Sequence, residues 1–338
     1  MNVRNRIEAM EESFIIPAGA KSKDSLGRER AESLDDTRTA YMIDRDRIIH
    51  CKSFRRLKRK TQVYIKTWND HYRTRLTHTL EVSQIARTIG RGIGLNEDLI
   101  EAIALGHDIG HVAFAHSGEE VLNEILPNGF SHNENSIRIL KHIENGGKGL
   151  NLTKEVLDGI LYHSGFSNKE IKAFTLEGQV VKYSDKIAYV NHDIDDSLRA
   201  GLLKMEDIED DILKILGYSH GERIDTLVKD CITTTTDNIK ENLLEVAFSK
   251  DIDKKFKDLR SFMFEKIYNG NVLKEERDRA RFILKHVYEY FYKNPNKLPE
   301  FYRDIAKSEG VSQGVADYIS GMSDEYCIKI FEDIYIPK

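Results

Sequence analysis

Histidine residues gather in one stretch of the sequence. Seven of the twelve lie between His71 and His142. Imidazole binds divalent metals and moves protons near neutral pH, so this concentration suggests a metal or acid–base site. His78 has a defined place, because Val82, Ile85 and Ile89 follow it at helical spacing and put it on the buried stripe of a helix. For a lone histidine, a core residue bonded to a backbone carbonyl would be the plainer interpretation.

The pair His107-Asp108 joins two kinds of metal ligand in consecutive residues. It follows an apolar run and lies between Gly106 and Gly110, which predict the end of a helix. Adjacent side chains on a continuous helix diverge by about 100°, but at a helix end relaxed by glycine both can turn toward one ion. An imidazole beside a carboxylate suits a divalent cation. The alternative is a solvated helix end with an ordinary ion pair.

Asp185 lies on a long predicted helix with two different faces. One face is apolar, and the other carries Asp185, Tyr189 and His192. An acid, an aromatic ring and an imidazole on one stripe suit the wall of a pocket better than a solvated surface. The alternative of simple exposure stays open.

Basic residues that could bind phosphate form a third feature. The run 52–60, KSFRRLKRK, holds six cations, and Arg73, Arg75 and Lys186 stand near the candidate metal residues in the sequence. Arginine and lysine are the usual partners of phosphate oxygens. A charge run is more often a solvated face, and we expect that of Arg59.

Helices must position these residues. Only five prolines occur, and the long intervals between Pro17, Pro127 and Pro295 leave helices free to run, so we predict an all-α fold. Residues 61–68 predict a small strand or hairpin. The helices are expected at 36–60, 75–94, 97–110, 116–126, 132–143, 153–163, 178–200, 205–216, 221–248, 254–268, 274–293, 310–320 and 324–334.

We expect three parts along the chain. Residues 1–35 should form an irregular N-terminal arm, 36–204 the catalytic core, and 205–338 a C-terminal helical subdomain packed on that core. The composition of the 338 residues, 40% hydrophobic and 32% charged, is that of a soluble globular protein. A net charge of −5 argues against a general nucleic-acid coat.

Several features predict a cytoplasmic protein. The sequence has no run of 18 apolar residues and therefore no membrane span. Its first residues carry acids and no apolar segment, so no signal peptide is expected. The three cysteines lie far apart without a C-x-x-C pair, which excludes a thiolate zinc site and favours a reducing compartment.

The order His78, His107-Asp108, Asp185 resembles the H…HD…D signature of the HD superfamily of metal-dependent phosphohydrolases. Longer blocks narrow the resemblance to the deoxyguanosinetriphosphate triphosphohydrolase-like (dGTPase-like) family, and they run in family order from about residue 44 to 331. The family has proline after His111, where this chain has Val112-Ala113, and this departure alters a loop without removing a catalytic group. The blocks are DRDRIIHCKSFRRLKRKTQV, YRTRLTHTLEV, LGHDIGHVAFAHSGEE, NGFSHNENSIRIL, DKIAYVNHDIDDSLRAG and DYISGMSDEYCIKIF.

The resemblance implies roles for individual residues. The implied metal ligands are His78, His107, Asp108 and Asp185. The implied reaction centre comprises His111, His116 and His132, with Glu119 as the acidic partner of His116. Phosphate binding is implied for Arg75 and Lys186, and recognition of the deoxyribose and its 3′-hydroxyl for Gln62, Tyr189 and Asp193.

The resemblance also implies the reaction and an HD-domain helical fold. A deoxynucleoside triphosphate, dGTP favoured, would be hydrolysed to deoxynucleoside and tripolyphosphate by metal-activated water attacking the α-phosphorus. The divalent ion could be Mg²⁺, Mn²⁺, Fe²⁺, Zn²⁺ or Ni²⁺, because two histidines and two aspartates accept all of them. His116 would be a proton carrier or a second base. A homo-oligomer is expected, with nucleic acid at most as a regulator.

Other functions remain open at this point. A nucleotidase or phosphodiesterase of the same superfamily, or a nucleotide-binding sensor without catalysis, would share these features. The segment from His107 to His111 also satisfies the H-[DE]-x-x-H pattern of metallopeptidases, but Gly110 lies inside the required helix and zincins use Glu rather than Asp.

Overall fold

The computed structural model describes residues 2–63, 72–165, 172–270 and 273–337. Within these ranges the regular structure is helical, and paired extended backbone is confined to the isolated bridges Arg28–Thr153 and Thr61–Thr74. The all-α prediction is confirmed. Among the described helices, none is long and apolar enough to cross a membrane.

The chain divides into two compact units, each assembled from separate segments. The first unit contains residues 1–49, 78–107 and 151–272. The second unit contains residues 50–77, 108–150 and 273–338. The domain boundaries expected at residues 36 and 204 stay predictions.

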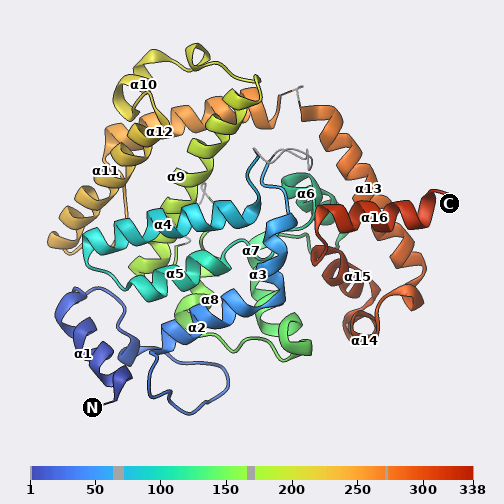
Figure 1. Ribbon diagram of the computed structural model, residues 1–338, viewed down its shortest axis with the longest axis horizontal. Helices are drawn as coiled ribbons and strands as arrows, with labels where there is room; N and C mark the ends of the chain where they lie inside the picture. The colour runs from blue at the N-terminus through green and yellow to red at the C-terminus, as the bar shows by residue number, and fades with distance from the viewer. Residues whose placement is uncertain (1, 64–71, 166–171, 271–272, 338) are drawn as a thin grey trace. The chain divides into compact units, whose positions relative to one another are not determined.

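In the first unit, α5, α8 and α9 pack against one another, and α11 and α12 pack on α9 (Figure 1). The apolar stripe predicted on α4 is buried, since Val82, Ile85 and Ile89 are at most 1% exposed. A Cβ on Gly106 would lie 2.4 Å from Ile160, so glycine there lets α5 approach α8. The helices of this unit are α1 (Val3–Phe14), α2 (Ala40–His50), α4 (Arg75–Ile93), α5 (Glu97–Gly106), α8 (Lys154–Leu161), α9 (Leu176–Arg199), α10 (Asp210–Leu216), α11 (His220–Lys240) and α12 (Lys250–Met263), with short turns η1 (Ser22–Asp24), η5 (Met205–Asp207) and η6 (Phe264–Tyr268); α2 and α4 each extend by up to three residues into the second unit.

The second unit packs α13 against α6, α15 and α16. Val112 and Phe114, from the loop before α6, are buried in the same apolar core as Leu284 and Ile319. The altered loop Val112-Ala113 is therefore part of a hydrophobic core. The helices of this unit are α3 (Lys52–Arg56), α6 (Ala115–Ile125), α7 (His132–Arg138), α13 (Lys274–Lys293), α14 (Glu300–Glu309), α15 (Val311–Ser320) and α16 (Asp324–Tyr335), with short turns η2 (Leu57–Arg59), η3 (Ile139–Ile143), η4 (Glu144–Gly147) and η8 (Pro295–Lys297).

Some predicted elements were wrong. The arm predicted to be irregular contains α1, which Asn2 caps by accepting from the Asn5 N–H. The helix predicted over 221–248 ends at Lys240, and the left-handed backbone of Asn242 (φ 62°) stops it. Helix α14 was not predicted, because Pro299 reads as a break although it precedes the first turn of that helix. The strand predicted at 61–68 falls mostly outside the described residues.

Candidate active site

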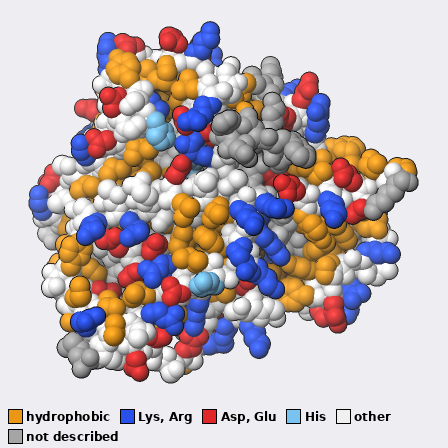
Figure 2. Space-filling model, in the orientation of Figure 1, with side chains coloured by type: hydrophobic (Ala, Val, Ile, Leu, Met, Phe, Trp, Pro, Cys, Tyr) orange, Lys and Arg blue, Asp and Glu red, His pale blue; other side chains and the backbone are white. Residues whose placement is uncertain are grey.

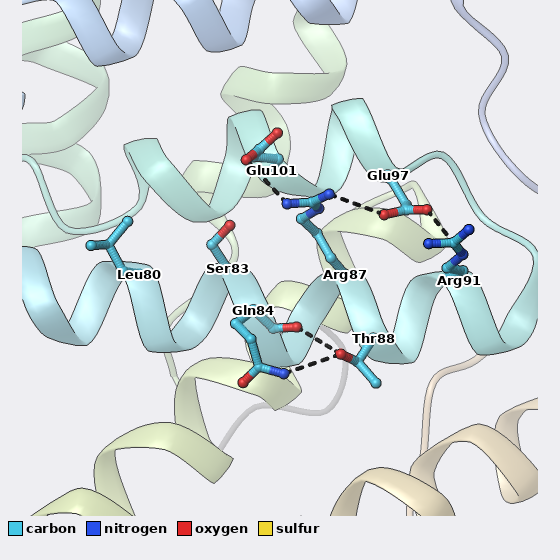
Figure 3. A pocket seen from close by; sticks show the side chains of 8 residues that line it. All are labelled: Leu80, Ser83, Gln84, Arg87, Thr88, Arg91, Glu97 and Glu101. Atoms are coloured by element: carbon cyan, nitrogen blue, oxygen red, sulfur yellow. Dashed lines mark hydrogen bonds and ion pairs between the residues drawn. The ribbon is translucent and has the colours of Figure 1, made fainter.

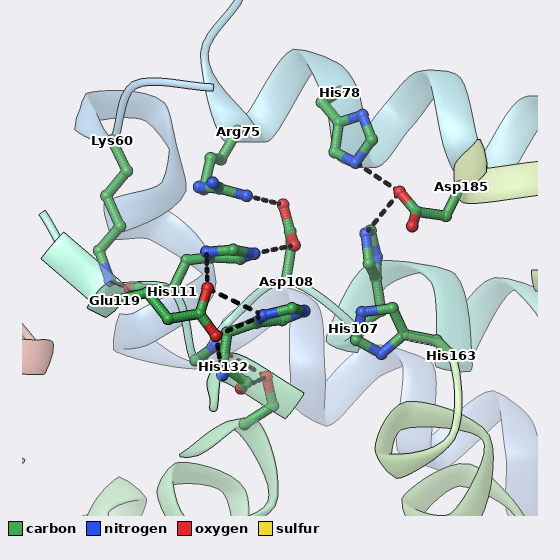
Figure 4. Close-up of polar contacts among 12 residues, drawn as sticks. Lys60, Arg75, His78, His107, Asp108, His111, Glu119, His132, His163 and Asp185 are labelled. Carbon is green, nitrogen blue, oxygen red and sulfur yellow. Dashed lines mark hydrogen bonds and ion pairs between the residues drawn. The ribbon is translucent and has the colours of Figure 1, made fainter. Parts of the chain in front are cut away.

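Three of the four predicted metal ligands converge inside the first unit (Figure 4). His78 comes from α4, His107 follows the end of α5, and Asp185 comes from α9. The Nε2 atoms of His78 and His107 lie 3.1 and 3.8 Å from the same oxygen, Oδ1 of Asp185. Both imidazoles are almost completely buried. Segments far apart in the sequence thus bring three candidate donor atoms to one point.

The opposite nitrogen of each ring determines what Nε2 can do. Nδ1 of His107 lies 2.6 Å from the carbonyl oxygen of Ala104. A carbonyl only accepts, so Nδ1 carries the proton, and in the neutral ring the lone pair is on Nε2, facing Asp185. This arrangement is typical of metal-binding histidines.

His78 can reach the same state through a second histidine. Nδ1 of His78 is hydrogen-bonded to Nε2 of His192 at 2.9 Å. Nδ1 of His192 lies 2.8 Å from Oδ1 of Asp193, but the two atoms make no hydrogen bond. When His192 Nε2 accepts the bond from His78, the lone pair of His78 is on Nε2.

This donor set fits a divalent cation. Two imidazole lone pairs aimed at one carboxylate oxygen repel that oxygen unless a positive charge lies among them. Protons on the imidazoles can supply that charge in place of a metal: burial would raise the pKa of Asp185, but a hydrogen bond from His78 and the positive charges of His78, His107 and His163 hold it well below its usual range. Nitrogen and oxygen donors of this kind suit Zn²⁺, Mn²⁺, Fe²⁺, Ni²⁺ or Mg²⁺.

His163 and His192 were not among the predicted site residues. The ring of His163 packs edge-on against that of His107, with centroids 4.9 Å apart, and its Nδ1 donates to the carbonyl of Ile160 at 2.6 Å. His192 could have been found from the sequence, because it shares the helical stripe of Asp185. No sequence pattern pointed to His163, whose position depends on how α8 packs.

The predicted phosphate and sugar residues of α9 also lie in the first unit. Burial and the neighbouring Lys182 lower the pKa of Lys186 to about 7. The hydroxyl of Tyr189 accepts from Arg260, and Tyr268 donates its hydroxyl proton to Asp193. Arg260 and Tyr268 were not predicted, because they come from α12 and η6, more than seventy residues along the chain.

Asp108, the fourth predicted ligand, has its partners in the second unit. Nη1 of Arg75 lies 2.7 Å from Oδ2 of Asp108, and Nε2 of His111 lies 3.0 Å from Oδ1. Both partners are almost fully buried. Burial, followed by the charges of Arg75 and His132, lowers the pKa of His111 well below its ordinary value, so this imidazole is neutral.

The predicted catalytic histidines surround Glu119. His132 stacks on His111 with ring centroids 3.9 Å apart. Glu119 Oε1 lies 2.9 Å from Nδ1 of His132, whereas its Oε2 is 3.7 Å from Nδ1 of His116, whose side chain is 70% exposed. The closer partner of this acid is therefore His132 rather than the predicted His116.

Charge in this cluster is divided between Glu119 and His132. Burial would raise the pKa of Glu119, but hydrogen bonds with His116 and His132 hold it far below its usual range. Burial lowers the pKa of His132, and the hydrogen bond and charge of Glu119 outweigh burial, leaving the pKa raised. The pair can hold a proton on an imidazole at neutral pH.

Two further predictions concern the segment before α4. Gln62 is buried, and its Oε1 has no hydrogen-bond partner among the residues that the structure describes. In the basic run, Arg56 donates to the Gly321 carbonyl, Arg59 pairs with Glu325, and Lys60 is buried. Figure 2 shows a group of basic side chains on the surface over α3 and η2. In these two elements Lys52, Arg55 and Lys58 are exposed. Part of the basic run thus binds the C-terminal segment around Gly321 and Glu325 rather than a phosphate group.

A separate hollow of about 360 Å³ lies between α4 and α5 in the first unit (Figure 3). None of the predicted site residues lines it. Its basic residues Arg87 and Arg91 pair with Glu97, and Arg87 also pairs with Glu101. The opposed charges leave no excess to bind an anion, and we assign this hollow no function.

The residues of this candidate site lie mostly within regions that match known protein families. An HD domain matches residues 75–190, and a phosphohydrolase-associated domain matches residues 246–333. A deoxyguanosinetriphosphate triphosphohydrolase-like protein of Clostridium tetani (strain Massachusetts / E88) is 68% identical over 340 residues, covering 100% of this chain and 97% of that protein. The chain belongs to the deoxyguanosinetriphosphate triphosphohydrolase-like family.

Other members of the family match with the same completeness. Proteins of that name from Clostridium perfringens (strain SM101 / Type A) and Caldanaerobacter subterraneus are 60% and 52% identical, and each match covers 100% of this chain. It covers 99% and 97% of those proteins. The resemblance drawn from the sequence is confirmed: this member of the dGTPase-like family is an HD-domain phosphohydrolase.

Proposed function

We propose that this dGTPase-like protein hydrolyses deoxynucleoside triphosphates to deoxynucleoside and tripolyphosphate with the help of a divalent metal ion. The observation that carries the proposal is the convergence of His78 and His107 on Asp185 Oδ1, with His107 held in the metal-binding tautomer. A preference for dGTP is proposed from the name of the relatives.

The metal would be held by His78, His107, Asp108 and Asp185. Asp108 is proposed as the fourth ligand because it is bonded directly to His107 along the chain. When bound, such an ion lowers the pKa of water and draws charge from phosphoryl oxygens.

Protein side chains would supply the remaining functions. Arg75 and Lys186 would hold phosphate oxygens, since each is a buried basic side chain. His132, protonated beside Glu119, can give a proton to the departing 5′-oxygen or stabilise negative charge on the phosphate chain. His116 is exposed and could exchange a proton with water.

Recognition of the sugar is proposed for Gln62, Tyr189 and Asp193. The Oε1 atom of Gln62 is a buried acceptor that a sugar hydroxyl could satisfy. Tyr268 and Arg260 fix Asp193 and Tyr189 by hydrogen bonds, so both would meet the substrate with little freedom to adjust. A fixed polar site discriminates steeply between related sugars, and dNTPs should outrun NTPs.

A substrate panel tests the proposal. Purified protein is incubated with each common dNTP and NTP, with Mg²⁺ or Mn²⁺, and the products are separated by chromatography. We expect deoxynucleoside and tripolyphosphate from dNTPs. Equal rates with ATP and dATP, or orthophosphate as the sole phosphate product, would refute the proposal. Nucleotide binding without any product would indicate a sensor.

Assembly and location are proposed on separate grounds. Phe282, Tyr292, Tyr326 and Tyr335 on α13 and α16 are more than 40% exposed, and such surfaces favour contact with another subunit. Light scattering should then give a multiple of 39.0 kDa. The three cysteines are buried and unpaired, as expected for a cytoplasmic protein.

A further inference from the structure

The carboxylate of Asp324 joins two distant backbone segments of the second unit. Asp324 begins α16 and is completely buried. Its Oδ2 accepts the backbone N–H of Thr61 at 2.9 Å, and its Oδ1 accepts that of Phe114 at 3.0 Å. Both oxygens accept hydrogen bonds from main-chain N–H groups. Burying a carboxylate costs folding free energy, and these bonds offset that cost while they hold the two segments together.

The Phe114 bond holds a backbone conformation that would not be stable by itself. Phe114 and Ala115 both have left-handed φ angles, 64° and 54°, which non-glycine residues disfavour. Phe114 is also the N-cap of α6, and its own side chain makes no capping bond. Asp324 therefore caps α6 from another helix, and α6 carries His116 and Glu119.

The Thr61 bond holds the segment that leads to Gln62. In the same segment, the Lys60 carbonyl accepts the N–H of Arg75 at 3.0 Å. The Lys60 ammonium group donates to the carbonyls of both His111 and Ser320. One C-terminal turn, Ser320–Asp324, is thus tied to two segments that carry or precede proposed catalytic or binding residues. Lys60 links the start of α4 to the first of them.

We propose that Asp324 is a positioning residue for the reaction, with Lys60 as its auxiliary. Together they fix the backbone before α6 and the backbone on either side of Thr61, so that Glu119, His132, Arg75 and Gln62 keep their relative positions. The inference rests on the proposed function for its catalytic meaning. Its structural meaning, local ordering of residues 58–62 and 110–116, does not depend on any substrate.

The variant Asp324→Asn tests this role with little change in shape. Asparagine has one acceptor oxygen, so one of the two backbone N–H groups loses its partner. Asp317→Asn is the matched control, because Asp317 is another buried acid of the C-terminal segment and pairs with Arg138 instead of the loop before α6. Lys60→Met removes the auxiliary tie and serves if Asp324→Asn does not fold.

Hydrogen–deuterium exchange and steady-state kinetics are measured together on the full-length chain. We expect exchange in Asp324→Asn to rise in residues 58–62 and 110–116 only, and kcat to fall by about 10²-fold, the cost of small misplacements in an active site. Bound metal should be unchanged. Asp317→Asn should lose thermal stability yet keep both kcat and local protection. Lys60→Met should raise exchange in the same two segments.

Two results would overturn the inference. One is exchange that rises evenly through the second unit, and the other is a kcat for Asp324→Asn equal to that of Asp317→Asn at equal loss of stability. If the wild-type chain hydrolyses no dNTP, the proposed function fails, while the exchange pattern alone still decides whether Asp324 orders the two segments.

Discussion

His107 donates from Nδ1 to the carbonyl oxygen of Ala104, 2.6 Å away. This local bond, between residues three apart at the end of α5, leaves the lone pair of the neutral ring on Nε2. Because that lone pair faces Asp185, the ring is prepared to bind a cation before any cation arrives.

Substituting His107→Ala should therefore remove bound metal. Elemental analysis of the purified protein should show the loss, because one of the proposed donor atoms is gone. His142→Ala, which replaces an exposed histidine, is the control and should keep its metal. Full occupancy in His107→Ala would show that the ion is held elsewhere.

His192→Ala should weaken metal binding without removing a ligand. His192 orients His78 through the 2.9 Å bond between their rings, and loss of such an outer partner costs about 10- to 100-fold in metal affinity. Calorimetric titration of the metal-free protein with Mn²⁺ measures this affinity. Asn191→Ala removes a neighbouring buried polar residue that bonds Arg223, and its affinity should stay at the wild-type value; equal weakening in both variants would refute the role of His192.

Lys186 predicts a pH dependence of substrate binding. Burial and Lys182 lower its pKa to about 7, so the positive charge is lost as the pH rises through that value. If the charge holds phosphate, KM for a dNTP should rise above pH 7. Lys186→Arg keeps its charge at any pH used, and its KM should vary less. Parallel KM profiles for the two proteins would exclude Lys186 from phosphate binding.

The sequence predicted those features of the fold and the site that depend on helical periodicity or on resemblance to the family. The apolar stripe after His78 gave the buried face of α4, because helix period and burial are local properties. The partnership of Glu119 with His132 rather than His116 was missed, since it depends on how α7 docks beside α6. Asp324 was beyond reach, because its partners lie 263 and 210 residues away in the chain and only the tertiary fold brings them together.

Glu119→Gln should alter how stability depends on pH. Burial lowers the pKa of His132, but Glu119 outweighs it and raises the pKa above 6.5. Protonated His132 then stabilises the folded chain fully below pH 6.5, and this contribution is lost as the pH rises through the raised value. The unfolding midpoint of the variant should fall less with rising pH above 6.5, as calorimetry can show. Glu120→Gln, an exposed neighbour, should follow the wild type; a Glu119→Gln profile with the same slope would contradict the assignment.

Identifying which bond of dGTP is broken tests the central claim most directly. Hydrolysis of dGTP is run in water labelled with heavy oxygen, with Mn²⁺ supplied, and the products are examined by mass spectrometry. Attack at the α-phosphorus breaks its bond to the 5′-oxygen, so the label should appear in tripolyphosphate and the deoxyguanosine should be unlabelled. Label in the deoxyguanosine hydroxyl, or release of labelled orthophosphate with dGDP, would contradict the account.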